Sequence, residues 1–175
     1  MRWARHVLAL GVAVGVAGCE TVDERKRALP CPNFLLLGHA EGMTKFSDGP
    51  GRDVTDVNFR TKITNFLGSC DHTASGIEAE LFVDITVERG PANRSHEASF
   101  EYFVAIPRFH PAPAGKKILP ITVTFEENKK WLVYRDQISI EIPLGNKEVA
   151  AKYDVYLGFQ LTEEQLEFNR RRRAR

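Results

Sequence analysis

Residues 77–88 read IEAELFVDITVE, and this stretch decides the fold class. Apolar side chains occupy every second position from Ile77 to Val87, and most of the positions between them are acidic or carry a hydroxyl. Successive side chains of a β-strand point to opposite faces of a sheet. The period of two therefore predicts a strand with one buried and one solvated face.

The same alternation recurs along the chain, bounded by Gly, Pro, Asn and Asp. It predicts further strands over residues 57–67, 100–106, 118–125, 131–142 and 153–161, with two short strands in 34–46 flanking Gly38 or Gly42. No segment of helical period separates them. Seven or eight strands at this spacing predict an all-β domain over residues 33–161, a β-sandwich of two antiparallel sheets. A closed barrel is the alternative architecture.

Residues 162–175 predict a short C-terminal helix with an arginine-rich tail. Thr162 and Gln165 form a capping-box pattern, in which each side chain binds a free backbone N–H of the other residue. Acids in the first turn and arginines in the last turn match the helix dipole. We expect Leu161, Leu166 and Phe168 to attach the helix to the sandwich, with the arginines projecting from its end.

The first 18 residues predict a signal peptide. Arg2 and Arg5 give a positive start, and residues 7–16 form an apolar run that is too short to cross a bilayer, which needs about 20 helical residues. The following residues 16–19, VAGC, resemble the lipobox of bacterial lipoproteins. That resemblance implies cleavage between Gly18 and Cys19 and a lipid on the Cys19 sulfur, which would hold the protein on a membrane.

Residues 19–32 are interpreted as a lipidated tether, because they are charged, lack an apolar face and end in Pro30-Cys31-Pro32. In the lipoprotein family an aspartate directly after the lipidated cysteine favours retention in the inner membrane. Glu20 stands at that position here. The resemblance therefore favours a protein anchored in the outer membrane, facing the periplasm, over one in the inner membrane.

Two further resemblances bear on the domain. From Cys31 onward the chain resembles a group of small Gram-negative envelope lipoproteins. Two motifs carry this resemblance, GRDVTD (51–56) and GFQLT (158–162). No activity comes with that resemblance. Residues 153–159, YDVYLGF, resemble a late strand of an immunoglobulin-like or fibronectin-like domain, in which a tyrosine precedes alternating core residues. This implies a sandwich of that type.

Cys31 and Cys70 remain once Cys19 is assigned to the lipid. An even number of cysteines outside the cytoplasm favours a disulfide. The alternative is a reactive thiol pair or a metal site, which would want close spacing or nearby histidines. His72 stands beside Cys70, but only prolines flank Cys31, so the structural bridge is the favoured interpretation.

The sequence predicts no catalytic residues, no cofactor and no resident metal. The candidate histidines are scattered, and no nucleophile or zinc-protease motif accompanies them; they are His39, His72, His96 and His110. Asp48, Asp53 and Asp56 surround a Gly-Pro-Gly turn and could converge on calcium, but aspartates also cap turns by binding backbone amides. The turn interpretation is favoured.

Charge is divided between an acidic body and a basic tail. Seven of the 24 basic residues lie before Cys19 or after Asn169, which leaves 17 against 23 acids and a charge of −6 between those residues. The tail arginines are candidates for binding anionic lipid or cell-wall polymer; they are Arg170, Arg171, Arg172, Arg173 and Arg175. The alternative is a solubilising helix end that folds back on the acidic body. Nucleic acid is not an expected partner.

The leading functional hypothesis is therefore a lipid-anchored envelope interaction module, without catalysis, that holds a partner protein near the membrane. An anion binder using the C-terminal arginines is the first alternative, and a small-ligand carrier or enzyme is the second. Sheet edges can accept a partner's strand. Outward-facing aromatics such as Phe82 and Phe103 would strengthen that idea if they cluster.

Overall fold

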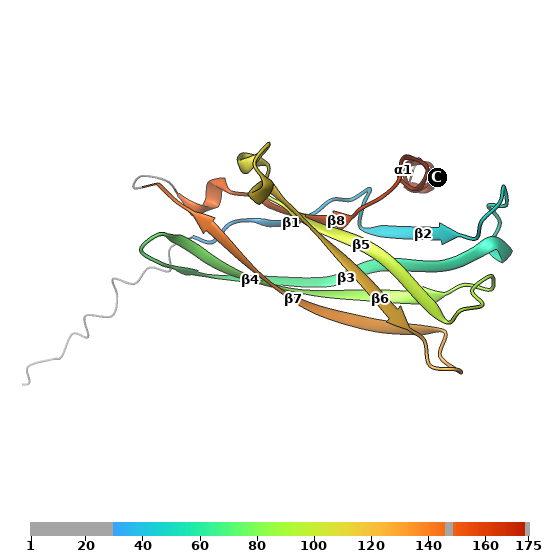
Figure 1. Cartoon of the computed structure of the whole chain (residues 1–175). Helices are drawn as coiled ribbons and strands as arrows, with labels where there is room; N and C mark the ends of the chain where they lie inside the picture. The colour runs from blue at the N-terminus through green and yellow to red at the C-terminus, as the bar shows by residue number, and fades with distance from the viewer. Residues whose placement is uncertain (1–29, 146–148, 174–175) are drawn as a thin grey trace, which may run out of the picture.

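The computed structural model describes residues 30–145 and 149–173, and strands dominate it (Figure 1). The chain forms eight strands in two four-stranded sheets. Their bounds are β1 (Phe34–Leu36), β2 (Gly42–Phe46), β3 (Val57–His72), β4 (Gly76–Arg89), β5 (Glu97–Ala105), β6 (Lys116–Thr124), β7 (Trp131–Pro143) and β8 (Val155–Phe159). The all-β prediction is confirmed, and because the sheets are separate the closed alternative is wrong.

The first sheet has the strand order β1-β8-β5-β6, and the second has the order β2-β3-β4-β7. All neighbouring strands are antiparallel except β1 and β8, which are parallel. The chain crosses between the sheets after β1, after β4, after β6 and after β7. Each sheet therefore contains strands from both halves of the sequence.

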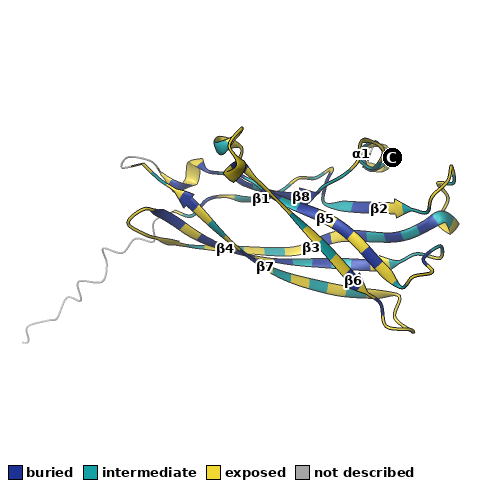
Figure 2. Ribbon diagram, viewed as in Figure 1, coloured by how far each residue is buried: buried dark blue, intermediate teal, exposed yellow. Residues whose placement is uncertain are grey.

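A single hydrophobic core lies between the two sheets. The alternate residues Leu81, Val83, Ile85 and Val87 of β4 are completely buried, as their period of two predicts, and Figure 2 shows this alternation along the ribbon. The rings of Phe59 in the second sheet and Phe100 in the first have centroids 6.3 Å apart. Burying each large side chain contributes about 1.5–3 kcal/mol, so this shared core is what holds the sheets together.

The two sides of this two-layer arrangement differ. On one side β1 and β2, joined by five residues, place one short strand at the edge of each sheet. On the other side β6 and β7 form the opposite edges and cross in Figure 1. Inward-facing side chains here are only partly buried, among them Leu119 and Ile121 of β6 and Leu132 and Tyr134 of β7. The β6–β7 side is the open side of the core.

The predicted C-terminal helix is present as α1 (Glu163–Arg173). Its capping box is confirmed: the Thr162 N–H donates to Gln165 Oε1 at 2.9 Å, and the Gln165 N–H donates to Thr162 Oγ1 at 3.3 Å. Among the described residues, no helix is long and apolar enough to cross a membrane.

The strand β3 is longer than the sequence predicts. A bulge between Ile63 and Asn65 shifts the register, so inward positions are odd-numbered before it and even-numbered after it. The prediction ended at Leu67 because the following residues, GSCDH, contain only one apolar side chain, Cys70, and so lose the alternation. The two short strands predicted within 34–46 are β1 and β2, and Gly38 lies in the connection between them.

Candidate functional site

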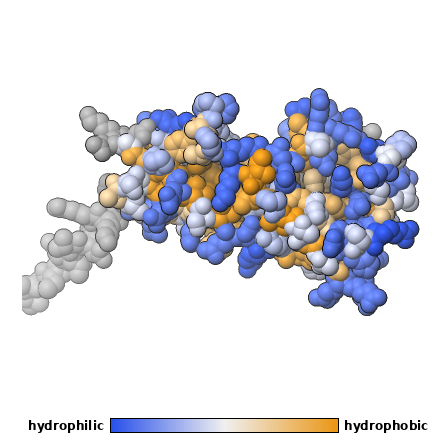
Figure 3. All heavy atoms as spheres, viewed as in Figure 1, coloured by the Kyte–Doolittle hydropathy of each residue, from blue (hydrophilic) through white to orange (hydrophobic). Residues whose placement is uncertain are grey.

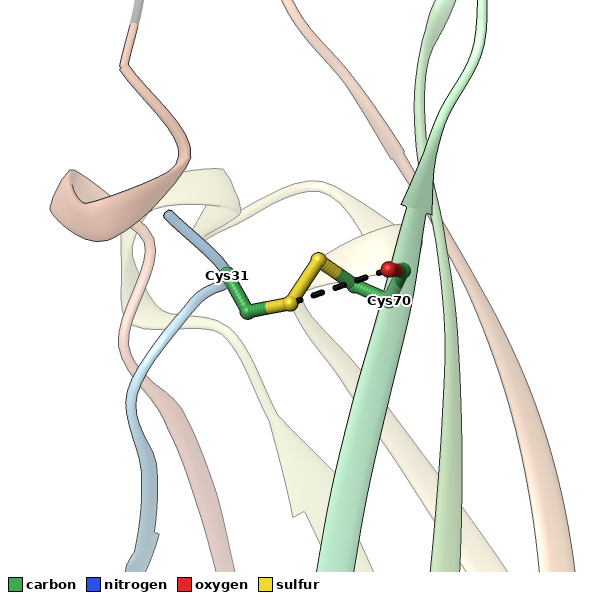
Figure 4. Close-up of a disulfide and its surroundings, with 2 residues drawn as sticks. All are labelled: Cys31 and Cys70. Carbon is green, nitrogen blue, oxygen red and sulfur yellow. Dashed lines mark hydrogen bonds between the residues drawn. A yellow bond between two sulfur atoms is a disulfide. The ribbon is translucent and has the colours of Figure 1, made fainter. Parts of the chain in front are cut away.

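The predicted anchor, with cleavage at Gly18 and lipidation at Cys19, lies outside the described residues, as do Glu20 and Arg175. The described part of the chain begins at Pro30, one residue before Cys31. Cys31 and Cys70 are joined by a disulfide, with Cα atoms 5.7 Å apart (Figure 4). The bridge fixes the start of the described chain to the far end of β3.

The aspartates of the 48–56 turn serve the backbone. Asp53 Oδ1 accepts the Val54 N–H at 2.6 Å, and Asp56 Oδ2 accepts the Asp53 N–H at 2.9 Å, forming a capping box for a short 3-10 turn. Within the described ranges no group of three or more His, Cys, Asp or Glu side chains is placed to hold a metal ion. The turn interpretation accounts for Asp53 and Asp56.

The helix α1 is docked on the β1–β2 connection and on β2. Asn169 Nδ2 donates to the carbonyl oxygens of His39 (2.9 Å) and Gly42 (2.7 Å). The ring of Phe168 meets that of Phe46 edge to face, with centroids 5.2 Å apart. Leu161 packs against the core and Leu166 is half-buried. The expected attachment by apolar residues is confirmed, and Asn169 adds a polar attachment that the sequence analysis missed.

A salt bridge holds the first turn of α1 to the 48–56 turn. Arg52 Nε lies 2.5 Å from Glu164 Oε1, and the Arg52 guanidinium also stacks 5.3 Å from the Phe46 ring centroid. The hydrogen bond from Arg52 lowers the pKa of the Glu164 carboxyl below its ordinary value, and desolvation only partly opposes it.

The four described tail arginines do not project together, contrary to expectation. Arg170 pairs with Glu167 of its own helix, and Arg173 reaches back to Glu41 with an N–O distance of 3.1 Å. Arg171 lines a small cavity beside Lys45 and Arg52, whereas Arg172 turns to another cavity. Successive helical residues are about 100° apart, so a run of four arginines must spread over the helix surface.

A cavity of about 360 Å³ lies between the C-terminal half of α1 and the outer face of the second sheet. Its lining includes Arg172 and Arg173 from the helix and Arg60 and Lys62 from β3. Phe59 and Ile63 are buried in the core, so the alternate residues Arg60 and Lys62 share the outer face. The sequence analysis missed Arg60 and Lys62, because alternation places them on this face but does not say what covers it.

The outer edge of β7 carries unpaired backbone groups. At the two ends of the β4–β7 ladder, the Arg89 N–H donates to the Lys130 carbonyl (2.7 Å) and the Leu144 N–H donates to the Ser75 carbonyl (3.3 Å). Antiparallel ladders alternate, so even-numbered residues of β7 bind β4 and odd-numbered residues turn their N–H and C=O groups to the free edge. The Asp136 carboxylate accepts one of these donors, the Gln137 N–H, at 2.9 Å.

The outer edge of β6, unlike that of β7, is interrupted by a proline. The Phe125 N–H donates to the His96 carbonyl, and the Ile106 N–H donates to that of Gly115, so odd-numbered residues of β6 bind β5. Pro120 is even-numbered, and its missing N–H therefore falls on the free edge, where it costs the sheet no hydrogen bond. Lys116 and Lys117 add charge to this edge, and both devices discourage a further strand.

A buried titratable group, Tyr102, links the two sheets. Tyr102 of β5 is fully buried, and its hydroxyl donates to Asp136 Oδ2 of β7 at 2.5 Å, across the two sheets. Burial, and then the bond to Asp136, raise the pKa of the Tyr102 hydroxyl well above its ordinary value. Tyr102 therefore stays protonated and acts as a link between the sheets.

The aromatics Phe82 and Phe103 do not form one patch. Phe82 lies on the outer face of the second sheet, where its register partner in β3 is the exposed Leu67. Phe103 belongs to β5 of the first sheet, and the Lys116 ammonium lies 4.3 Å from its ring centroid. Leu67 is 66% exposed, and Trp131 (63%) and Val133 (51%) on β7 are exposed to a similar degree.

No family model, curated protein or solved structure matches the chain.

Proposed function

We propose that the protein is a lipid-anchored interaction module of the cell envelope, without a catalytic role, that holds a partner protein near the membrane. The partner contributes an extended segment that pairs with the free edge of β7 and extends the second sheet by one strand. The observation that carries this proposal is the contrast between the two edges on the open side: Pro120 interrupts the free edge of β6, whereas no proline interrupts the free edge of β7 before its last residue.

The backbone of β7 supports this mode of binding. Apart from Gln137, the odd-numbered residues offer N–H groups to an added strand, and the only proline of β7 is its last residue, Pro143. Its one cationic side chain, Arg135, is already paired with Asp84, with an N–O distance of 2.6 Å. Main-chain hydrogen bonds would supply affinity, and alternate side chains would supply specificity.

The side chains around β7 define the chemistry of the partner segment. Its inward-facing residues must be apolar, because they would cover Leu132, Tyr134 and Ile140, which are now only partly buried. Figure 3 shows apolar surface among charged side chains on the face where β6 and β7 cross. Next to the start of β7, a cavity of about 320 Å³ lined by Trp131 and Leu132 offers space for one further apolar side chain.

We infer that the sandwich is of the immunoglobulin-like type. The pairing of β4 with β7 and of β5 with β8 corresponds to the B–E and C–F pairs of that fold. Tyr153, buried just before β8, occupies the place of the tyrosine that precedes strand F in such domains. The parallel pairing of β1 with β8 is a departure from a simple antiparallel scheme.

The anchor part of the proposal rests on the VAGC motif at residues 16–19. Growth of the bacterial host with labelled palmitate should label the protein, and Cys19→Ser should abolish the label. Fractionation should place the labelled protein in the outer membrane. Persistent labelling of Cys19→Ser would contradict both the proposed lipid anchor and the proposed membrane location. It would not bear on strand addition at the β7 edge, which is tested separately.

The β7 edge is tested by photocrosslinking in intact cells, with a crosslinking amino acid in place of Val133. We expect a discrete adduct with another envelope protein. Ser139→Pro removes a free-edge N–H without touching the β4 ladder and should reduce the adduct at least tenfold. Ile118→Pro makes the same change on the free edge of β6 and should leave the adduct unchanged.

Hydrogen exchange on the reconstituted complex distinguishes strand addition from other contacts. The amides of Val133, Arg135 and Ser139 should exchange fast in the free protein and become protected in the complex. An adduct without this protection would contradict strand addition. An adduct between two copies of this chain would indicate self-association instead of binding to a different protein, and it would also contradict the proposal.

A further inference from the structure

Three cationic side chains from two distant parts of the sequence meet at the cavity beneath α1. Arg60 and Lys62 stand two residues apart on the outer face of β3, and Arg172 lies in the last turn of the helix. More than a hundred residues separate the strand from the helix in sequence. The docking of α1 on β2, which is the neighbour of β3, is what brings them together.

The acidic groups at this cavity do not neutralise the three cations. Four basic residues line it, Arg60, Lys62, Arg172 and Arg173, against two acidic ones, Glu41 and Glu88, which leaves a charge of +2. Glu41 is already engaged by Arg173. Glu88 is the register partner of Arg60, but among the described residues Arg60, Lys62 and Arg172 form no ion pair with a carboxylate.

Several contacts hold the helix wall of the cavity in place. The capping box and the Asn169 bonds hold α1 against the β1–β2 connection, and the Arg173–Glu41 pair fixes its last turn. The guanidinium of Arg172 lies 5.8 Å from the Phe168 ring centroid, and Phe168 is itself packed on Phe46. Arg172 is therefore held at the cavity, and an anion bound there would reduce the repulsion among the three cations that line it.

We propose that this cavity binds a phosphate-bearing ligand through Arg60, Lys62 and Arg172. Guanidinium groups bind phosphate oxygens with paired hydrogen bonds, and a lysine ammonium adds a point charge, so the three groups suit a multiply charged phosphate such as a pyrophosphate or a phosphorylated headgroup. A cavity of about 360 Å³ accommodates a ligand of that size. A single carboxylate would leave part of the charge uncompensated.

The position of the cavity in the fold is part of the proposal. Lys62 and Cys70 lie eight residues apart on β3, which corresponds to about 26 Å of strand. The cavity therefore lies at the opposite end of β3 from the disulfide, near which the described chain begins. A phosphate ligand would therefore bind at the end of the domain that is remote from the predicted tether, residues 19–32. This inference does not depend on the β7 edge.

The test is calorimetric titration of the full chain, purified in a neutral detergent, with sodium pyrophosphate at low salt. We expect saturable binding that weakens as salt is raised, because salt screens exposed charges. The double variant Arg60→Gln/Lys62→Gln should weaken it at least tenfold. The control Lys117→Gln/Lys152→Gln removes the same charge from the region of the first sheet and should change the affinity less than twofold.

A second arm distinguishes the two sources of phosphate. The same titrations are made with detergent micelles that contain phosphatidylglycerol in place of pyrophosphate. Binding of pyrophosphate alone would assign a soluble phosphate ligand, and binding of the micelles alone would assign a lipid headgroup, provided that Arg60→Gln/Lys62→Gln weakens it. Absence of both, or equal loss in the control variant, would overturn the proposal. Circular dichroism verifies that the variants are folded.

Discussion

The ring of Phe34 in β1 lies directly over the backbone of Gly68 in β3, so close that a Cβ on Gly68 would overlap its Cδ2 and Cε2 atoms. These residues belong to different sheets. The missing side chain of Gly68 is what lets the short strand β1 pack closely on the second sheet.

Gly68→Ala should therefore destabilise the protein by about 1–3 kcal/mol, because the Phe34 ring must leave its position or the two sheets must move apart. Urea denaturation followed by circular dichroism measures this change. Ser69→Ala, at the neighbouring outward-facing position, serves as the control and should change stability far less. An unchanged midpoint for Gly68→Ala would show that Phe34 has another position of equal energy.

Tyr102→Phe should cost about 1–2 kcal/mol, since it removes a buried hydrogen bond to a carboxylate without creating a large cavity. Tyr134→Phe removes the same atom from a half-buried ring on β7. Among the described residues the Tyr134 hydroxyl makes no hydrogen bond between the sheets, so this substitution should cost less. The two free energies of unfolding are compared at pH 7. Equal costs would contradict a special role for the Tyr102–Asp136 link.

Stability should decline at alkaline pH through the same residue. The folded state raises the pKa of the Tyr102 hydroxyl, so folding favours the protonated form. Its contribution is complete below the pKa of an unfolded tyrosine, about 10, and is lost progressively as the pH rises above that value. Urea midpoints measured from pH 8 to pH 11 should fall in the wild type and fall less steeply in Tyr102→Phe.

The disulfide closes a loop with a sequence separation of 39 residues. Cys31→Ser/Cys70→Ser should reduce stability by about 2–5 kcal/mol, mainly because the unfolded chain gains conformational freedom. Thermal unfolding with and without a reducing agent makes the measurement. Reduction should lower the melting temperature of the wild type and leave that of the double variant unchanged, whereas equal melting temperatures throughout would exclude a structural role for the bridge.

The attachment of α1 should weaken in acid. Arg52 lowers the pKa of Glu164, so this pair contributes stability above the pKa of an unfolded glutamate, about 4.3, and loses it as the pH falls through the lower folded value. Amide exchange in α1, corrected for its intrinsic pH dependence, should therefore accelerate below about pH 4. Glu164→Gln should abolish that step, and a step of unchanged size would assign it to another carboxylate.

Alternation in residues 77–88 was sufficient to predict an all-β chain, because a period of two is a local property of a strand that is buried on one face. The capping residues Thr162 and Gln165 likewise predicted where α1 begins. Residues 68–72 of β3, GSCDH, were missed because Cys70 is the one apolar side chain among them. They are a strand because the ladder with β4 continues to His72, and that pairing leaves no local signal.

The surfaces were less predictable than the fold. The arginine run suggested one site that binds anions. Only the docking of α1 shows that Arg172 lines the same cavity as Arg60, whereas Arg170 pairs with Glu167. The proline at position 120 was visible in the sequence, yet its meaning depends on which edge its nitrogen faces. Both features arise from contacts between distant segments.

The position of the disulfide determines how the domain responds to mechanical force. Cys31 precedes β1, so tension applied to the chain at residue 30 passes through a covalent bond into Cys70 and the sixteen-residue strand β3, which is paired with β4 along most of its length. The three-residue ladder of β1, which would otherwise be the first to peel away, lies outside the path of the load. Stretching the amino end therefore strains a long strand and spares the weakest one.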